Sequence, residues 1–225
     1  MKLYYHPIST TCRPIMLLAG EADIELDYQL VDLFTGAQYQ PDFEAVNPCH
    51  QVPVLDDGGF RLTESSAILK YLADQKGVAS YPADARLRAR INERMDWFNT
   101  GFYRDFSYGF IYPQIFPFMR RADDVVQAGT IAYGRDKALG WLKILDQHLI
   151  GPRNKFLCGD AVTIADYFGA ILAVGIESIG GNYNAYPNIT RWMNNMKGLK
   201  SWAKTNEVFY QFGVEPNKGK SFLGL

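Results

Sequence analysis

The residues with the clearest chemical potential near the N-terminus are the serine, threonines and cysteine of Ser9–Cys12. They follow the strand-forming residues Leu3–Tyr5 and precede the apolar run Ile15–Ala19, so they lie where a helix should begin. A hydroxyl at this place caps free backbone N–H groups. The same N–H groups and the positive end of the helix dipole also favour an anion, such as a carboxylate or a thiolate. The stretch is therefore either a plain helix cap or an anion site.

The spacing of Ser9 and Cys12 excludes dithiol chemistry at this helix start. A thiol–disulfide oxidoreductase needs two cysteines at these positions, and the first of them is the attacking thiolate. Here Ser9 occupies the first position, and we expect Cys12, about one turn into the helix, to be buried. Ser9 can instead donate a hydrogen bond to a thiolate that a ligand brings, which stabilises the anion without a covalent bond.

A second candidate binding element is Gln51–Leu55, where a proline interrupts a strand-like run. A proline in such a run is expected at a sheet edge or a bend, and its peptide bond can be cis at modest cost. We expect a cis bond before Pro53, which would turn the backbone N–H and C=O of Val52 outward to pair with an extended peptide. The neighbouring His50 either contacts a ligand carboxylate or lies on an exposed loop, and the same two interpretations apply to Gln38.

A third candidate is the helix start at Thr63–Ser66. The backbone N–H and hydroxyl of Ser65 could bind a carboxylate, and Glu64 could bind an ammonium group. Together these two residues match the carboxylate and amine of an α-amino acid. A simple helix cap with an acidic residue in its first turn explains the same residues equally well.

The elements that must position these candidates alternate between strands and helices. Over residues 1–76 the pattern predicts the order βαβαββα, with a hairpin across the turn Asp57-Gly58-Gly59. A connector follows at 77–84, and residues 85–225 read as all helical. This order predicts an α/β plus all-α chain, in which a thioredoxin-like domain is followed by a helical bundle.

In the helical part, one long helix is expected from Asp84 through Tyr112, interrupted near Gly109 and stopped by Pro113 and Pro117. Further on, Thr163-Ile164-Ala165-Asp166 has capping-box spacing, with aspartate in place of the usual glutamate or glutamine. The residues behind it are almost all apolar, as a buried central helix requires.

Composition limits the function classes. The chain of 225 residues has a formal net charge of −1, which gives no support for binding to nucleic acid or to a membrane surface. No apolar run is long enough to span a bilayer, and the N-terminus does not resemble a signal peptide. The three cysteines and three histidines are spaced neither as a disulfide framework nor as a metal site, so a reducing cytoplasm and no metal are expected.

Together these residues resemble the cytosolic glutathione transferase family, and most closely its theta and delta classes. The resemblance covers essentially the whole chain. It is carried by four groups of residues: Tyr4-Tyr5-x-Pro7-x-Ser9-x-x-Cys12-Arg13, Asn47-Pro48-x-His50-x-Val52-Pro53-x-Leu55, Glu64-Ser65-x-Ala67-Ile68 with Leu72, and Thr163-Ile164-Ala165-Asp166. It implies a glutathione transferase in which glutathione is a co-substrate and no other cofactor is needed.

The resemblance also assigns residues. It implies that Ser9 activates the thiol of glutathione, with Tyr5 as the fallback and with Thr10 or Thr11 as further hydroxyl donors. Glutathione-binding positions fall on seven residues: His50, Val52, Pro53, Glu64, Ser65, Gln38 and Ser66. At two of these positions, Gln38 and Ser66, delta enzymes often have histidine and arginine. Fewer positive groups should weaken the grip on the carboxylates of glutathione, by roughly 1–3 kcal/mol for a lost charge-assisted bond.

The second substrate is expected to be a small apolar electrophile. Aromatic residues are dense between Phe102 and Phe116, and Tyr103, Phe106 and Phe110 are spaced to share one helix face. Such a stripe belongs to the core more often than to a pocket. The resemblance places the electrophile against Tyr103, Phe106, Tyr112 and Phe116, and matching Tyr112 requires a one-residue insertion near Gly109.

The resemblance further implies a homodimer, with the α/β domain of one subunit against the helical domain of the other. Two other functions stay open for this fold. One is a glutathione-dependent disulfide reductase, and the other is a non-enzymatic interaction protein. The residues alone do not name the electrophile.

Overall fold

A four-stranded mixed sheet forms the first part of the chain in the computed structural model, which describes residues 1–225. The strands lie in the order β2-β1-β3-β4, where β1 is parallel to β2 and antiparallel to β3. The hairpin predicted across Asp57-Gly58-Gly59 is confirmed, since β3 and β4 pair antiparallel on either side of it. The strand bounds are β1 Lys2–Tyr5, β2 Asp27–Leu30, β3 Val54–Asp57 and β4 Phe60–Leu62.

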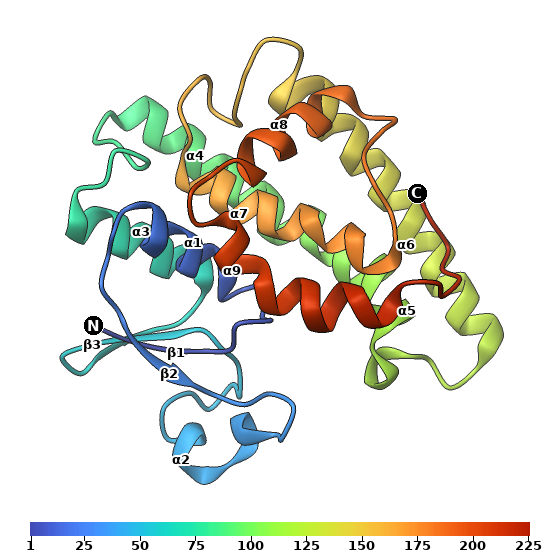
Figure 1. Ribbon diagram of the computed structural model, residues 1–225, viewed down its shortest axis with the longest axis horizontal. Coiled ribbons are helices and arrows are strands. Elements are labelled where there is room, and N and C mark those ends of the chain that lie inside the picture. The colour runs from blue at the N-terminus through green and yellow to red at the C-terminus, as the bar shows by residue number, and fades with distance from the viewer.

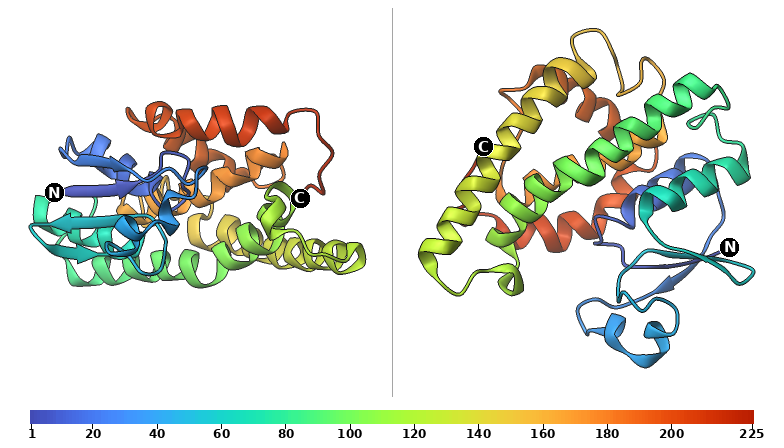
Figure 2. Two further views of the ribbon diagram at one scale, coloured as in Figure 1. Left: turned by 90° about the horizontal axis from the view of Figure 1, so that it is seen from below. Right: turned by 180° about the vertical axis from the view of Figure 1, so that it is seen from behind.

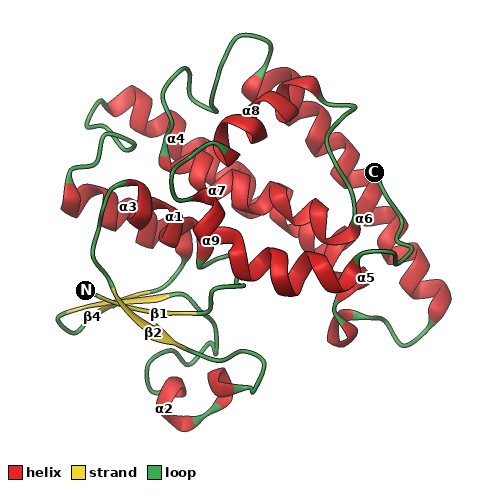
Figure 3. Cartoon of the chain, viewed as in Figure 1, coloured by secondary structure: helices red, strands yellow, loops and turns green.

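Three helices accompany the sheet, so the predicted order βαβαββα is confirmed. They are α1 Arg13–Glu21, α2 Pro41–Glu44 and α3 Ser65–Lys76. Helices α1 and α3 lie on the side of the sheet that faces the helical half of the chain, while the short α2 lies away from it (Figure 1). Figure 3 shows that strands occur only in this first part.

The rest of the chain is helical, and three of its helices continue into wider, π-type turns. Short 3₁₀ helices also occur, at Ala37–Tyr39 in the α/β part and at Pro117–Met119, Val174–Ile179 and Glu215–Asn217 in the helical part. The helix bounds are α4 Ala85–Trp97 with the π-type run Phe98–Ile111, α5 Tyr112–Ile115, α6 Asp124–Ile144 with the π-type run Leu145–Ile150, α7 Ile164–Ala173, α8 Pro187–Lys197, and α9 Trp202–Phe209 with the π-type run Tyr210–Val214.

Helix α7 is the centre of the helical half, between α4 and α9 (Figure 2). Every residue of α7 is buried, as its apolar composition predicts. Its N-terminus carries the predicted capping box, in which Asp166 Oδ2 accepts from the N–H and hydroxyl of Thr163, at 2.8 Å and 2.7 Å. Asp166 Oδ1 accepts from the N–H of Leu157 and the indole N–H of Trp192. The cap therefore also ties α8 to α7.

The prediction for the long helix was wrong at Gly109 and at Pro113, and it is confirmed at Pro117, before which the helical turns end at Ile115. Gly109 does not interrupt it, because the π-type run passes through Gly109 and packs there directly against Gly134 of α6. Pro113 does not stop it either, and helical turns continue to Ile115. A proline is tolerated in the first turn of a helix, where its missing N–H is not needed, and Pro113 is the second residue of α5.

One hydrophobic core runs through both parts of the chain. It joins Leu3 of the sheet and Ile15 of α1 to Phe98 and to the α7 residues Phe168 and Ile171. The contacts of α1 with α7 and α9 carry this core across the boundary between the parts. The helix start at Ser9–Cys12 is consequently held against the helical half.

None of the helices combines the length and the apolarity that crossing a bilayer requires.

Candidate active site

The hydroxyl of Ser9 lies at the start of α1 in a small hydrogen-bond network. Its Oγ accepts from the backbone N–H groups of Thr11 and Cys12, each at 3.3 Å, so it caps the turn that leads into α1 and not the helix itself, whose N-cap is Cys12. It also lies 2.9 Å from the hydroxyl of Thr11, which in turn donates to the carbonyl of Val52 at 2.9 Å. Because Thr11 has only one hydroxyl proton, the proton between the two hydroxyls belongs to Ser9.

The Val52–Pro53 peptide bond is cis, as predicted. The N–H of Val52 makes no hydrogen bond within the chain, so it is available to a ligand. The C=O of Val52 already accepts a hydrogen bond from the hydroxyl of Thr11. The N–H therefore fits the expectation that both groups are open to an added peptide, whereas the C=O has a partner within the chain. The hydrogen bond from Thr11 holds the Val52 backbone against the Ser9–Thr11 turn.

Cys12 is fully buried and is not a reactive thiol. Burial among Val31, Phe43, Val52 and Val54 raises the pKa of its thiol to about 11, although the hydrogen bond with Ser9 opposes the shift. The thiolate is the nucleophilic form, so Cys12 is almost wholly protonated and inert at neutral pH. This agrees with the expected burial of the second position of the Ser9-x-x-Cys12 spacing.

The helical half reaches the same turn through two tyrosines. Tyr112 donates its hydroxyl proton to Thr10 Oγ1 at 2.9 Å, and the hydroxyl of Tyr103 lies 3.2 Å from that of Tyr112. Since the Tyr112 proton points to Thr10, Tyr103 is the donor in the second bond. Burial raises the pKa of both tyrosines, so both are protonated at neutral pH. The chain Tyr103–Tyr112–Thr10 therefore ends beside Ser9.

The aromatic stripe divides differently from the prediction. Phe106 is fully buried and stacks on Phe102 at 4.5 Å between ring centroids, and Phe110 is also buried, so both belong to the core. Phe106 is therefore wrong as a residue lining a substrate surface. Tyr103 lies instead with Tyr108 and Tyr112, and its ring centroid is 5.0 Å from that of Tyr108 and 6.2 Å from that of Tyr112. The π-type run explains this division, because a wider turn brings residues five apart onto one face.

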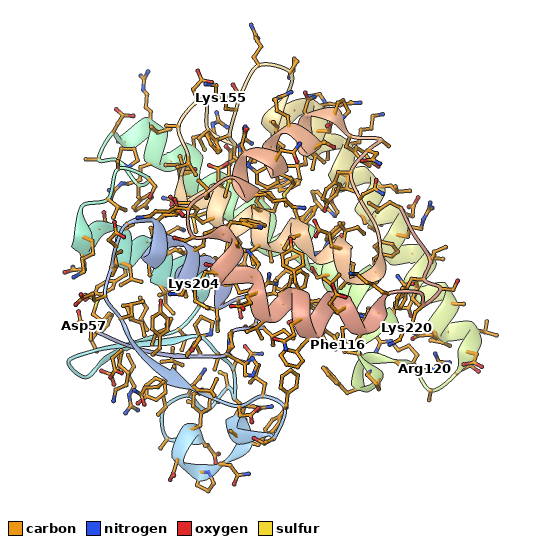
Figure 4. All side chains as sticks on the ribbon, viewed as in Figure 1. Asp57, Phe116, Arg120, Lys155, Lys204 and Lys220 are labelled. Atoms are coloured by element: carbon orange, nitrogen blue, oxygen red, sulfur yellow. The ribbon has the colours of Figure 1, made fainter.

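Tyr112 and Phe116 do lie together, with ring centroids 5.1 Å apart. Phe116 also stacks on Phe118, which the sequence analysis missed and which is strongly exposed. The ring centroid of Tyr108 lies 5.2 Å from that of Tyr112. Tyr108 was missed because the expected α-helical winding does not bring residues five apart onto one face. In Figure 4, Phe116 lies at the margin of the helical half that is turned toward the α/β half.

His50 and Gln38 lie in two segments outside the strands and contact each other. His50 Nδ1 lies 2.9 Å from the backbone carbonyl of Gln38, and the His50 ring lies 5.4 Å from that of Tyr39. The side-chain oxygen of Gln38 is buried and has no hydrogen-bond partner. The backbone carbonyl of Gln38 thus orients the His50 ring through Nδ1. The other ring nitrogen, Nε2, makes no hydrogen bond within the chain.

Glu64, Ser65 and Ser66 lie at the N-terminus of α3. No side chain caps this helix, so its first N–H groups are open to an anion. Glu64 is exposed, has a positive φ of 63°, and makes no ion pair. Ser65 is buried, and neither it nor Ser66 makes a side-chain hydrogen bond within the chain.

Tyr5, the fallback donor, is placed less well. Its ring packs edge-on against Tyr28 of β2 at 4.9 Å, and its hydroxyl makes no hydrogen bond to the Ser9 turn. The structure thus brings together Ser9, Thr10, Thr11 and Val52 with Tyr103 and Tyr112. His50 with Gln38, and Glu64 with Ser65 and Ser66, form two separate groups.

Comparisons with known proteins identify the family. The family model described as "Glutathione S-transferase, N-terminal domain" matches residues 1–74, and "Glutathione S-transferase, C-terminal domain" matches residues 111–199. A delta-class glutathione transferase of Nilaparvata lugens is 31% identical, over 96% of this chain and 95% of its own, with a TM-score of 0.77.

Two human structures are also similar. Human glutathione-S-transferase T1-1 is 26% identical over 93% of this chain and 89% of its own, with a TM-score of 0.81. Human glutathione transferase theta-2, at 24% identity over 100% of this chain and 93% of its own, shares the fold with a TM-score of 0.82. The chain therefore belongs to the cytosolic glutathione transferase family and resembles its theta and delta classes.

Proposed function

We propose that this enzyme activates glutathione through the hydroxyl of Ser9 and directs its thiolate at an apolar electrophile. The observation that carries the proposal is the setting of Ser9 Oγ, which accepts two backbone N–H groups at the positive end of α1. Donors on a hydroxyl oxygen make its own proton a stronger donor. In the ligand-free chain this proton goes to Thr11, so it turns from Thr11 to the sulfur when glutathione binds.

The glutathione backbone is proposed to lie along Val52. The free N–H of Val52, beside Pro53, supports pairing with an extended tripeptide. The open N-terminus of α3 supports binding of the γ-glutamyl carboxylate by Ser65 and Ser66. Glu64, which has no cationic partner in the chain, would take the α-ammonium group.

The glycine end of glutathione is proposed to lie near His50 and Gln38, which are held together by one hydrogen bond. Neither Gln38 nor Ser66 brings a positive charge. We therefore expect weaker binding of glutathione than at a site with a cation at either position, by roughly 1–3 kcal/mol for each charge-assisted bond that is not made.

The electrophile surface is proposed to consist of Tyr103, Tyr112 and Phe116, with Tyr108 and Phe118 added. Support comes from Tyr112, whose bond to Thr10 puts this aromatic group next to Ser9. The reaction uses the ionised sulfur as the nucleophile, and the steps assigned to these residues need no metal or redox cofactor.

Three wider features are proposals on the same footing. The chain divides into a glutathione-binding unit at 1–76, a linker at 77–84 and a helical unit at 85–225 that carries the electrophile surface. It acts in the cytoplasm as a homodimer, in which the α/β unit of one subunit packs on the helical unit of the other. Exposed apolar side chains such as Phe60, Val126 and Tyr133 support a partner surface.

The experiment that tests the proposal is a comparison of wild type and Ser9→Ala with a halide-bearing aromatic substrate. Removing one preorganised donor should lower kcat about 100-fold while glutathione binding, measured by calorimetry, changes little. Matched variants Tyr5→Phe and Thr10→Val should keep most of the activity. Equal loss in Ser9→Ala and either of these would move the role away from Ser9.

A further inference from the structure

Arg13 is a buried cation that has no anion. Its side chain is fully buried, and it makes no ion pair. Nη1 donates to Oδ1 of Asn206 at 2.6 Å, while Nε and Nη2 are buried without any hydrogen-bond partner. A charged side chain is rarely buried this completely unless it is paired, because desolvation of the charge costs several kcal/mol.

Nothing that packs around Arg13 cancels its charge. The groups that interact electrostatically with it are neutral at neutral pH: the hydroxyls of Tyr112, Tyr103 and Tyr210 in the helical half, and the thiol of Cys12. The ring centroid of Phe209 lies 4.2 Å from Cζ, which gives partial compensation through a cation–π contact. Burial lowers the pKa of Arg13 to about 10, so the guanidinium is still charged at neutral pH.

Arg13 directly follows the Ser9–Cys12 stretch, and its side chain extends to Asn206 and Phe209 of α9. The backbone N–H of Arg13 donates to the carbonyl of Ser9 at 3.1 Å. Tyr112, which interacts electrostatically with the guanidinium, donates to Thr10 at 2.9 Å, one residue from Ser9. A charge in a dry interior acts on its neighbours with little screening, so an anion beside Ser9 lies in its field.

We propose that Arg13 is the fixed counter-charge for the glutathione thiolate, acting through its electric field without touching the sulfur. The inference rests on the proposed function, since it assumes that glutathione ionises beside Ser9. It gives a reason for the absence of an acidic partner, because a carboxylate next to Arg13 would cancel the field that the thiolate needs. Arg13 is thus a supporting residue for the ionisation step, and Ser9 remains the donor.

Asn206 allows a test that leaves Arg13 in place. Asn206→Asp puts a carboxylate of nearly the same shape where Nη1 now meets an amide oxygen, and so neutralises the guanidinium. Asn206→Leu is the matched control, because it removes the hydrogen bond and adds no charge. The readout is a pH titration of the ultraviolet absorbance of bound glutathione thiolate. We expect Asn206→Asp to raise the pKa of the bound thiol by about 1 unit, and Asn206→Leu to leave it near the wild-type value.

A second pair of variants guards against misfolding of the first. Arg13→Met should raise the pKa of the bound thiol as Asn206→Asp does, and Arg13→Lys should not. Arg13→Met should also keep or increase the melting temperature of the ligand-free protein, since replacing an unpaired buried charge by an apolar group removes a desolvation penalty. A purely structural arginine would give the opposite result, a lower melting temperature and an unchanged thiol pKa.

The outcomes separate the inference from the function on which it rests. If wild type binds glutathione but forms no thiolate, the proposed function fails. If Ser9→Ala raises the thiol pKa while Asn206→Asp and Arg13→Met do not, only the role of Arg13 is overturned. Equal shifts in Asn206→Asp and Asn206→Leu would also overturn it, because they would show an effect of shape and not of charge.

Discussion

The hydroxyl of Ser9 is fixed on three sides before any ligand arrives. Two backbone N–H groups point at its oxygen, and Thr11 receives its proton. Thr11 in turn donates to the carbonyl of Val52, which links the start of α1 to the segment before Pro53. At the residue scale, the proposal assigns two roles to the same bonds, which hold the turn before α1 and would prepare Ser9 as a donor.

Cys12 gives a prediction about reactivity. Because burial raises its thiol pKa to about 11, it should resist a maleimide reagent at neutral pH in the folded protein, whereas the exposed Cys49 should react quickly. Mass spectrometry of the labelled chain distinguishes the two sites. Cys12→Ala should also keep its conjugation activity. Labelling of native Cys12 together with loss of activity would favour thiol exchange at this residue, and with it a disulfide reductase.

His6 gives a prediction about pH. It is buried, its Nδ1 accepts from the N–H of Ile8, and its carbonyl accepts from the N–H of Ser9. Desolvation lowers its pKa in the folded chain, although Asp32 opposes the shift. The unfolded chain, with a histidine pKa of about 6.5, therefore binds the proton first as pH falls. The stabilising contribution of neutral His6 is fully present above that value and is lost as pH falls toward the folded pKa.

Urea unfolding at pH 7.5 and at pH 5.5 tests the sign. Wild type should lose more stability between these pH values than His6→Asn, whose amide oxygen can still accept from Ile8 and does not titrate. An equal loss in both proteins would show that His6 does not carry the pH dependence.

The element that most shapes the site is the π-type run Phe98–Ile111. Its inner face carries four phenylalanines four residues apart, all fully buried: Phe98, Phe102, Phe106 and Phe110. Its other face carries Tyr103 and Tyr108, which reach Tyr112. The same run passes α6 at the close contact of Gly109 and Gly134. The π-type winding of this run and its close contact with α6 together determine the direction of the Tyr103 and Tyr108 side chains.

That crossing can be tested with two glycines of α6. A Cβ at Gly134 would overlap the carbonyl of Gly109, whereas a Cβ at Gly140 would meet nothing within 4 Å. Gly134→Ala should lower the free energy of unfolding by roughly 1–3 kcal/mol, the usual cost of overpacking. Gly140→Ala should raise it by about 0.5–1 kcal/mol, because alanine is the better helix former. Urea titrations measure both, and similar values for the two variants would contradict the crossing.

Several elements were predictable from local pattern. The order βαβαββα, the hairpin at Asp57–Gly59 and the capping box at Thr163–Asp166 each depend on residues close in sequence. The face assignment of Phe106 failed because it assumed the winding of an α-helix, and nothing local in Phe98–Ile111 signals a wider turn. The contact of Arg13 with Asn206 joins residues 193 apart and has no local signal at all.

At the scale of the whole molecule, the continuous core couples the two halves. All four tryptophans, Trp97, Trp141, Trp192 and Trp202, lie in the helical half, whereas the proposed glutathione site lies mainly in the α/β half. Because the core joins the halves, unfolding seen by tryptophan fluorescence should be a single transition that glutathione shifts. At 100 times its dissociation constant the ligand should add about 2.7 kcal/mol. Two transitions, with the tryptophan transition insensitive to glutathione, would show that the halves unfold independently.

Family membership establishes the fold and the general reaction. The central claim to test is that the hydroxyl of Ser9 stabilises the glutathione thiolate. The most direct measurement is the pH titration of the ultraviolet absorbance of the glutathione thiolate, with saturating glutathione bound to wild type and to Ser9→Ala. The account predicts thiolate at neutral pH in wild type and a thiol pKa raised by about 2 units in Ser9→Ala, equivalent to about 2.7 kcal/mol of lost thiolate stabilisation. Bound glutathione with the same thiol pKa in both proteins would contradict it.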